Sequence, residues 1–238
     1  MPKRTPKQKR DRIMVHGGDS VELVLVGNNF DEAAEAARRD AEDRGATLVE
    51  PFNARDTVIG QGTVAAEVLT QLTGFGKSLD SIFVPVGGGG LIGGIAAYLA
   101  DMSPRTAIIG TEPAGAASLA AAMNAGGPVT LEAIDPFVDG AAVKRIGDVN
   151  YRIIEENQGR IHIVDADEGA VCTNMLDLYQ NEGIIAEPAG ALSVTALDEV
   201  KLAPGSTVVC VISGGNNDVL RYAEIMERSL VHLSLIHI

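Results

Sequence analysis

Short apolar runs alternate with longer stretches of helical pattern along this chain, and the alternation predicts its secondary structure. We expect strands at 21–26, 47–50, 81–86, 106–110, 161–164 and 207–212. We expect helices at 30–44, 63–72, 91–100, 168–180 and 189–200. Gly45 follows the first of these helices and is expected to end it. Strands and helices in turn over this length predict an α/β fold with a parallel-rich sheet and flanking helices.

Composition narrows the class of protein. The 238 residues suffice for one large domain or two small ones, and 46% apolar residues can bury a sizeable core. The formal net charge is −13, opposite in sign to that of most nucleic-acid binders. Six basic residues crowd the first twelve positions: Lys3, Arg4, Lys7, Lys9, Arg10 and Arg12. We interpret them as a solvated helix face, with no nucleic-acid partner.

The cysteines and the apolar runs indicate which cellular compartment to expect. Only Cys172 and Cys210 are present, without CxxC spacing, whereas a secreted disulfide framework needs more. No run reaches the roughly 18 apolar residues of a membrane span. The N-terminal stretch lacks the apolar segment of a signal peptide. We therefore expect a cytoplasmic protein without a membrane partner.

The strongest chemical feature is a run of four glycines, Gly87–Gly90, between a predicted buried strand and the helix that opens at Leu91. Glycines let backbone N–H groups surround an anion, and the helix N-terminus favours negative charge. A merely tight turn would need one glycine, so we expect phosphate binding. Gly88, Gly90 and Gly93 also satisfy G-x-G-x-x-G, with Glu112 near the offset of a ribose-binding carboxylate. A dinucleotide site is therefore an alternative.

A second candidate follows the last predicted strand, where Ser213 begins the segment Ser-Gly-Gly-Asn-Asn-Asp. Ligands of parallel α/β sheets collect beyond the carboxyl ends of the strands. One ligand could therefore reach both this serine and the glycine run, and a hydroxyl there could bond a ring nitrogen. The same residues could equally form an ordinary loop or helix cap.

Five motifs in order carry a resemblance: GQGT (60–63), PVGGGGLIGG (85–94), GAAVKRIG (140–147), EPAGA (187–191) and SGGNND (213–218). Together they resemble the threonine dehydratases (threonine ammonia-lyases) of biosynthetic type. These belong to the tryptophan-synthase-β-like, fold-type-II enzymes that depend on pyridoxal 5'-phosphate (PLP). The similarity runs from the first residues to about His232.

The resemblance implies roles for individual residues. The PLP phosphate would be held by Gly87, Gly88, Gly89, Gly90 and Leu91, and the pyridine nitrogen by Ser213. Asn53 would lie near the ring hydroxyl and Glu187 near the ring. Some relatives bind a divalent cation through an acidic pair. Here Glu112 matches the first acid, but Ser118 stands at the second position, so no metal site is expected.

This chain departs from the family pattern at the lysine that would bind the cofactor. The family places it in a Ser-x-Lys-x-Arg-Gly-Ala type segment, and no lysine here has that context: Lys3, Lys7, Lys9, Lys77, Lys144 and Lys201. We expect no catalytic residue in this chain, because the Schiff-base lysine is absent. The chain is expected to be a fragment, without that N-terminal segment or any C-terminal regulatory domain, and inactive alone. Residues 1–50 would be a remnant of the smaller domain, 51–232 the larger PLP-binding domain, and 233–238 a non-family tail.

The implied activity of the whole enzyme is PLP-dependent deamination of L-threonine to 2-oxobutanoate and ammonia, the first step of isoleucine biosynthesis. The full-length enzyme is expected to form a homo-oligomer. Alternatives within the same fold are a serine/threonine dehydratase and a serine racemase. Alternatives of other classes are a nicotinamide-dependent oxidoreductase, and a non-catalytic PLP-binding or oligomerisation module.

Overall fold

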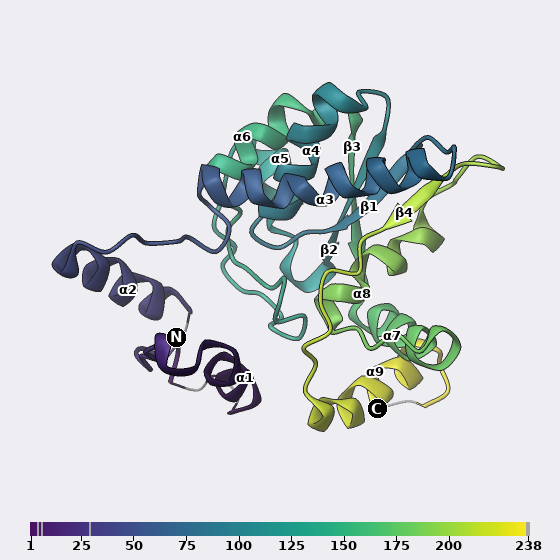
Figure 1. Ribbon diagram of the computed structural model, residues 1–238. Helices are drawn as coiled ribbons and strands as arrows, with labels where there is room; N and C mark the ends of the chain where they lie inside the picture. Colours follow the sequence, from purple (N-terminus) through teal and green to yellow (C-terminus); the bar gives the residue numbers. More distant parts are fainter. Residues whose placement is uncertain (4, 6, 29, 237–238) are drawn as a thin grey trace. The chain divides into compact units, whose positions relative to one another are not determined.

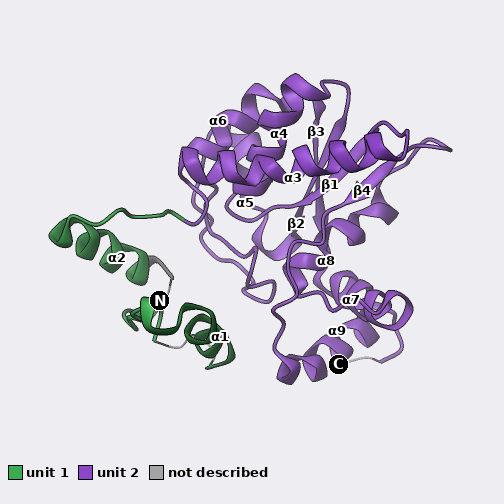
Figure 2. Ribbon diagram, in the orientation of Figure 1, with its two compact units in different colours: residues 1–50 green, residues 51–238 purple. Residues whose placement is uncertain are grey.

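The computed structural model describes residues 1–3, 5, 7–28 and 30–236. The chain divides into two compact units, Met1–Glu50 and Pro51–Ile238 (Figure 2). Assigning the first unit to a smaller domain and the second to a larger one stays a prediction.

The first unit contains two helices and no sheet among its described residues. Helix α1 spans Lys7–Gly17, the 3₁₀ turn η1 Gly18–Ser20, and α2 Phe30–Arg44. The bounds of α2 match the prediction, and Gly45 follows it with φ +64°. Helix α1 carries four residues of the basic cluster, Lys7, Lys9, Arg10 and Arg12, and has no buried residue. Lys3 precedes the helix, and Arg4 lies outside the described residues.

The predicted strands at 21–26 and 47–50 are wrong, since neither segment forms a strand. The backbone of the first segment hydrogen-bonds to the beginning of the chain. The Met1 ammonium donates to the Val24 carbonyl oxygen at 2.7 Å, and the Val26 N–H donates to the Met1 carbonyl oxygen at 2.9 Å. An apolar run becomes a strand only when a neighbouring strand pairs with its backbone along its length, and the described part of this unit offers none.

The second unit is built on a parallel sheet (Figure 1). Its strands are β1 (Ser81–Pro85), β2 (Ala107–Pro113), β3 (Ile161–Ala166) and β4 (Val208–Cys210). Their order is β3-β2-β1-β4 and every pairing is parallel. The α/β prediction is confirmed, and the four strands coincide with predicted ones. Because the order reverses direction at β1, the connections leave β1 on opposite sides, which makes a switch point between β1 and β4.

Helices cover both faces of this sheet (Figure 1). One side carries α3 (Arg55–Gly74), α4 (Gly90–Met102), α5 (Ser118–Ala125) and α6 (Asp148–Glu156). The other helices are α7 (Glu168–Glu182), α8 (Pro188–Thr195) and α9 (Tyr222–His232). Short 3₁₀ turns are η2 (Ala114–Ala116), η3 (Gln158–Arg160), η4 (Ala196–Glu199) and η5 (Val219–Arg221).

Alternate residues of β1 divide the core between the two faces. Ile82 and Val84 pack in the cluster that includes Ile95 of α4, whereas Phe83 packs with Ile109 and with Ala196 on the opposite side. All six of these side chains are essentially buried. A third cluster joins α7, α8 and α9. Because β1 is apolar on both faces, it reads as a continuous apolar run.

Helices α3 and α4 approach to backbone contact through glycine. A Cβ on Gly94 would meet the Val58 carbonyl oxygen and would lie 2.6 Å from the Gly62 nitrogen. The GQGT motif, which contains Gly62, therefore serves helix packing in this fold. The contact braces α4 along its side, and α4 is the helix that begins at the glycine run.

Candidate functional site

The two loops singled out from the sequence lie at neighbouring strand ends. Strands β1 and β4 are paired, with Phe83 opposite Cys210. Continuing this register by three residues sets Ser213 level with Val86, the residue before the glycine run. The two loops thus share the switch-point edge of the sheet, which is where ligands of open α/β sheets bind.

The glycine run forms an uncapped helix N-terminus. Gly89 is the N-cap of α4 and has φ +86°, ψ 0°, a left-handed conformation that only glycine adopts without strain. Among the described residues, no hydrogen bond is donated by the backbone N–H groups of Gly87–Gly90 or Leu91. A helix N-terminus with unused donors and no Cβ atoms around them fits a phosphate group.

The protein's own packing also demands some of these glycines. A Cβ on Gly87 would lie 2.9 Å from the Ala141 Cα and 3.0 Å from its carbonyl oxygen. A Cβ on Gly88 would overlap the Phe52 ring, with its Cε2 at 2.6 Å. The sequence pattern of the run indicated a ligand and gave no sign of this packing. The loop is therefore held from two sides by its own chain.

A polar cluster at the start of α6 holds the same loop. The Gly88 carbonyl oxygen accepts from the Gly147 N–H at 3.1 Å and from Asn150 Nδ2 at 2.6 Å. Asn53 Oδ1 accepts from the Val149 N–H at 3.0 Å and so caps α6. Phe52 and Asn150 were not identified from the sequence, because the residues that they contact lie far from them along the chain.

Three motifs converge beside Ser213. The Ser213 side chain is exposed, and its hydroxyl forms no hydrogen bond with the described residues. The Glu187 N–H donates to the Gly214 carbonyl oxygen at 3.0 Å. A Cβ on Gly214 would meet the Glu187 carboxylate, and one on Gly140 would lie 3.4 Å from Glu187 Oε1. The structure thus brings EPAGA, GAAVKRIG and SGGNND together around the Glu187 side chain.

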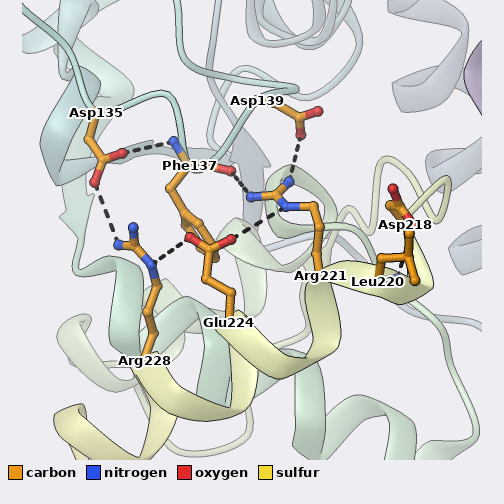
Figure 3. A network of polar contacts seen from close by, with 8 residues as sticks. All are labelled: Asp135, Phe137, Asp139, Asp218, Leu220, Arg221, Glu224 and Arg228. Carbon is orange, nitrogen blue, oxygen red and sulfur yellow. Dashed lines mark hydrogen bonds and ion pairs between the residues drawn. The ribbon is translucent and has the colours of Figure 1, made fainter. Parts of the chain in front are cut away.

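The segment before GAAVKRIG is tied to α9 by the network in Figure 3. The Phe137 ring faces two guanidinium groups, with the Arg228 Cζ at 4.0 Å from its centroid and the Arg221 Cζ at 4.9 Å. Arg221 also donates to the Phe137 carbonyl oxygen at 2.7 Å. The Phe137 N–H donates to Asp135 Oδ1 at 2.9 Å. This network fixes the segment that leads to Ala141, which packs on Gly87.

Glu112, at the end of β2, is occupied by the protein's own backbone. Its side chain is fully buried, and its two oxygens accept from the N–H groups of Leu119 and Ala120, each at 2.7 Å. Burial raises the pKa of Glu112 to about 7. A carboxylate committed to the start of α5 cannot also bond a ribose, so the dinucleotide interpretation loses its acidic residue. Ser118 is also buried, and the described residues contain no group of three or more potential metal ligands.

The lysines of the second unit are Lys77, Lys144 and Lys201. Lys144 belongs to GAAVKRIG, and its Nζ donates to the Glu132 carbonyl oxygen at 3.0 Å. Lys77 and Lys201 of the second unit are exposed. Both cysteines are free thiols whose pKa burial raises, to about 12 for Cys172 and about 11 for Cys210. Neither thiol is poised as a nucleophile at neutral pH.

Comparison with known proteins decides which cofactor this edge of the sheet suits. A family model described as pyridoxal-phosphate dependent enzyme matches residues 1–214. The chain belongs to this family. Family membership shows PLP as the cofactor, and the uncapped N-terminus of α4 and the exposed Ser213 hydroxyl are compatible with it. The dinucleotide alternative is thereby excluded.

Individual relatives sharpen the placement within the pyridoxal-phosphate dependent enzymes. The chain is 72% identical over 237 residues to the biosynthetic L-threonine dehydratase IlvA of Corynebacterium glutamicum. That alignment covers 100% of this chain and 54% of the relative, so the chain spans about half the length of this curated protein.

Two solved structures share the fold. The processed form of threonine deaminase isoform 2 from Solanum lycopersicum superposes with a TM-score of 0.84 at 32% identity, covering 96% of this chain and 65% of that chain. Maize serine racemase superposes with a TM-score of 0.81 at 28% identity, covering 98% of this chain and 70% of that chain. The fold-type-II prediction is therefore confirmed. No helix among the described residues is long and apolar enough to cross a membrane.

Proposed function

We propose that the complete protein deaminates L-threonine to 2-oxobutanoate and ammonia with PLP, and so opens isoleucine biosynthesis. The observation that carries this proposal is the 72% identity to a relative named biosynthetic L-threonine dehydratase. The reaction is balanced without an oxidant, because the water lost from the β-carbon is regained when the product nitrogen leaves as ammonia. When bound, PLP supplies the conjugated ring that withdraws negative charge from the α-carbon.

The chain's own residues bind and orient the cofactor in this proposal. The N–H groups of Gly87–Gly90 and Leu91 hold the phosphate, because they are unused donors at a helix N-terminus. The Ser213 hydroxyl bonds the pyridine nitrogen. A serine leaves that nitrogen unprotonated, which suits elimination at the β-carbon.

Two further residues complete the proposed contacts with the ring. The Asn53 side chain uses its oxygen to cap α6, so its Nδ2 is the group available to the ring hydroxyl. Glu187 lies between the Gly140 and Gly214 loops and is placed beside the ring. No lysine of this chain is assigned a catalytic role. The 238-residue chain is therefore proposed to bind PLP without a covalent bond and to be inactive alone.

Two preparations test the proposal, namely this chain and the complete protein encoded by the reading frame that contains it. With L-threonine and PLP, the complete protein is expected to form 2-oxobutanoate, measured by lactate-dehydrogenase-coupled NADH oxidation. The chain alone is expected to form it no faster than free PLP. A complete protein that releases no oxo acid from threonine would contradict the proposed activity. A chain that exceeds the PLP-only rate would contradict the assignment of no catalytic residue.

A serine racemase or serine dehydratase is the second candidate, because maize serine racemase shares the fold with a TM-score of 0.81. Its lower identity of 28% makes it the weaker one. Turnover of L-serine and L-threonine by the complete protein, with D-serine measured by chiral chromatography, separates the two. We further propose a homo-oligomer in the cytoplasm. Free thiols at both cysteines are consistent with that compartment.

A further inference from the structure

Two donors hold the carbonyl group of one peptide in the glycine run. The Gly88 oxygen accepts from Asn150 Nδ2 at 2.6 Å and from the Gly147 N–H at 3.1 Å. Asn150 has no exposed surface. Its Nδ2 also donates to the Phe52 carbonyl oxygen at 2.9 Å, so one amide group joins α6, the Phe52 segment and the glycine run.

Fixing this carbonyl fixes the next N–H group. The peptide between Gly88 and Gly89 is planar and trans, since the described residues contain no cis peptide bond. The C=O and N–H of a trans peptide point in opposite directions. Because the Gly88 oxygen faces Gly147 and Asn150 at the start of α6, the Gly89 N–H faces away from them.

The adjacent bonds would not hold this orientation alone. Glycine has no Cβ, so the dihedral angles on both sides of this peptide are unusually free. Gly89 already occupies the left-handed region, and the described residues offer its N–H no acceptor. A free glycine peptide can rotate so that its carbonyl oxygen, instead of its N–H, faces an anion. Two donors on the Gly88 oxygen oppose that rotation.

We propose that Asn150 is a positioning residue that orients the Gly88–Gly89 peptide so that the Gly89 N–H donates to the cofactor phosphate. This inference rests on the proposed function. Asn150 touches neither the cofactor nor the substrate; it acts through the loop. Its removal therefore weakens the phosphate-dependent part of binding and leaves the ring-dependent part unchanged.

The experiment compares two probes, PLP and pyridoxal, which lacks the phosphate. Affinities of both are measured by fluorescence titration for the wild-type chain and for Asn150→Ala. The wild-type chain is expected to prefer PLP. In Asn150→Ala this preference is expected to fall by about tenfold, the size of one hydrogen bond to a charged group, while pyridoxal affinity stays constant. A purely structural role would lower both affinities together.

Controls keep the result interpretable. Asn174→Ala removes a partly buried side-chain amide whose Nδ2 donates to the Ala170 carbonyl oxygen at 3.1 Å within α7. This variant is expected to leave the preference unchanged. Asn150→Ser replaces Asn150→Ala where circular dichroism shows that the alanine variant is unfolded. A folded Asn150 variant with the wild-type preference overturns the inference.

A second readout needs no variant. Inorganic phosphate is titrated into the ¹⁵N-labelled wild-type chain, and the amide signals of the glycine run are followed by NMR. The Gly89 amide is expected to move downfield. If Gly90 and Leu91 respond while Gly89 does not, the phosphate site stands and the role of Asn150 is wrong. If none responds and PLP is bound no better than pyridoxal, the proposed phosphate site itself is wrong, and the inference with it.

Discussion

Two neighbouring strands, β1 and β2, both lead into helices at the same edge of the sheet. The first backbone N–H groups of these two helices differ in whether the chain supplies an acceptor for them. At the start of α5, the N–H groups of Leu119 and Ala120 donate to Glu112, a carboxylate of the chain itself. At the start of α4, no described side chain accepts from the corresponding N–H groups. One N-terminus carries its own anion, and the other is available to an external one.

The helix that follows β3 repeats the α5 pattern. Asp167 caps α7 by accepting from the Ala170 N–H at 2.9 Å. Of the first α-helices after β1, β2 and β3, only α4 begins without a side-chain acceptor among the described residues. Helix N-termini attract negative charge in general, so that property alone does not locate a ligand. The α4 N-terminus differs in two ways together, since it lacks an acceptor among the described residues and is formed by four successive glycines.

The largest expected effect is a pH dependence of the unfolding free energy caused by Glu112, the carboxylate at the N-terminus of α5. The ordinary pKa of the glutamate carboxyl is 4.5, and burial raises the pKa of Glu112 to about 7. The folded state therefore holds the proton more tightly than the unfolded state between these values. The stabilisation is complete below pH 4.5 and is lost as pH rises towards 7, by on the order of 3 kcal/mol at most.

Urea unfolding of the wild type and Glu112→Gln from pH 4.5 to 8 measures this effect. Because the glutamine cannot ionise, the difference in unfolding free energy between the two proteins is expected to shift against the wild type as pH rises. Burial also raises the pKa of Asp165, and the charges of Asp165 and Glu112 repel each other, so the difference between the two proteins reports the ionisation of Glu112 together with this repulsion. A difference that is constant with pH would show that Glu112 does not titrate in this window.

The next effect concerns the packing of the open N-terminus. Gly87→Ala places a Cβ 2.9 Å from the Ala141 backbone, which cannot rotate away. We expect a loss of about 1–3 kcal/mol in unfolding free energy and loss of PLP binding. Gly127→Ala is the matched control, since a Cβ there meets nothing within 4 Å. Urea denaturation and PLP titration of both variants provide the measurement. Wild-type PLP affinity in Gly87→Ala would contradict the site.

The smallest expected effect on stability comes from Ser213. Its side chain is exposed, so Ser213→Ala is expected to change the unfolding free energy by less than about 0.5 kcal/mol. PLP affinity is expected to weaken by about two- to tenfold, the size of one neutral hydrogen bond. The absorbance band of bound PLP reports the nitrogen contact directly. Unchanged affinity and an unchanged band would remove Ser213 from the site. Ser206→Ala is the control, and it is expected to leave PLP affinity and the absorbance band unchanged.

The predictable part of the fold is the part whose signals are local. Strand β1 is an unbroken apolar run, and α2 ends at a glycine, so both were found close to their observed bounds. The segment 21–26 has a similar apolar pattern but lacks a pairing strand, and pairing is not written in the segment itself. Helices α5 and α6, of 8 and 9 residues, carry too few turns for a clear period.

The candidate site also has a part that the sequence predicts and a part that it does not. The glycine run and Ser213 follow directly from strands, so their shared edge could be inferred from parallel topology. The partners that hold the run could not. Asn150 lies 62 positions from Gly88, and Glu112 turns inward to α5 instead of facing a ligand. Such contacts depend on the tertiary fold, because burial and backbone capping decide them.

The strand order of the sheet has a consequence for folding during synthesis on the ribosome. Ser81 of β1 pairs with Val208 of β4, a separation of 127 residues. At ribosomal speeds of 5–20 residues per second, the edge of β1 waits roughly 6–25 s for its partner. During that interval the unpaired edge of an apolar strand is available to other nascent chains. The yield of folded protein in a cell is therefore expected to depend on synthesis rate and chaperone supply more than on the stability of the finished molecule.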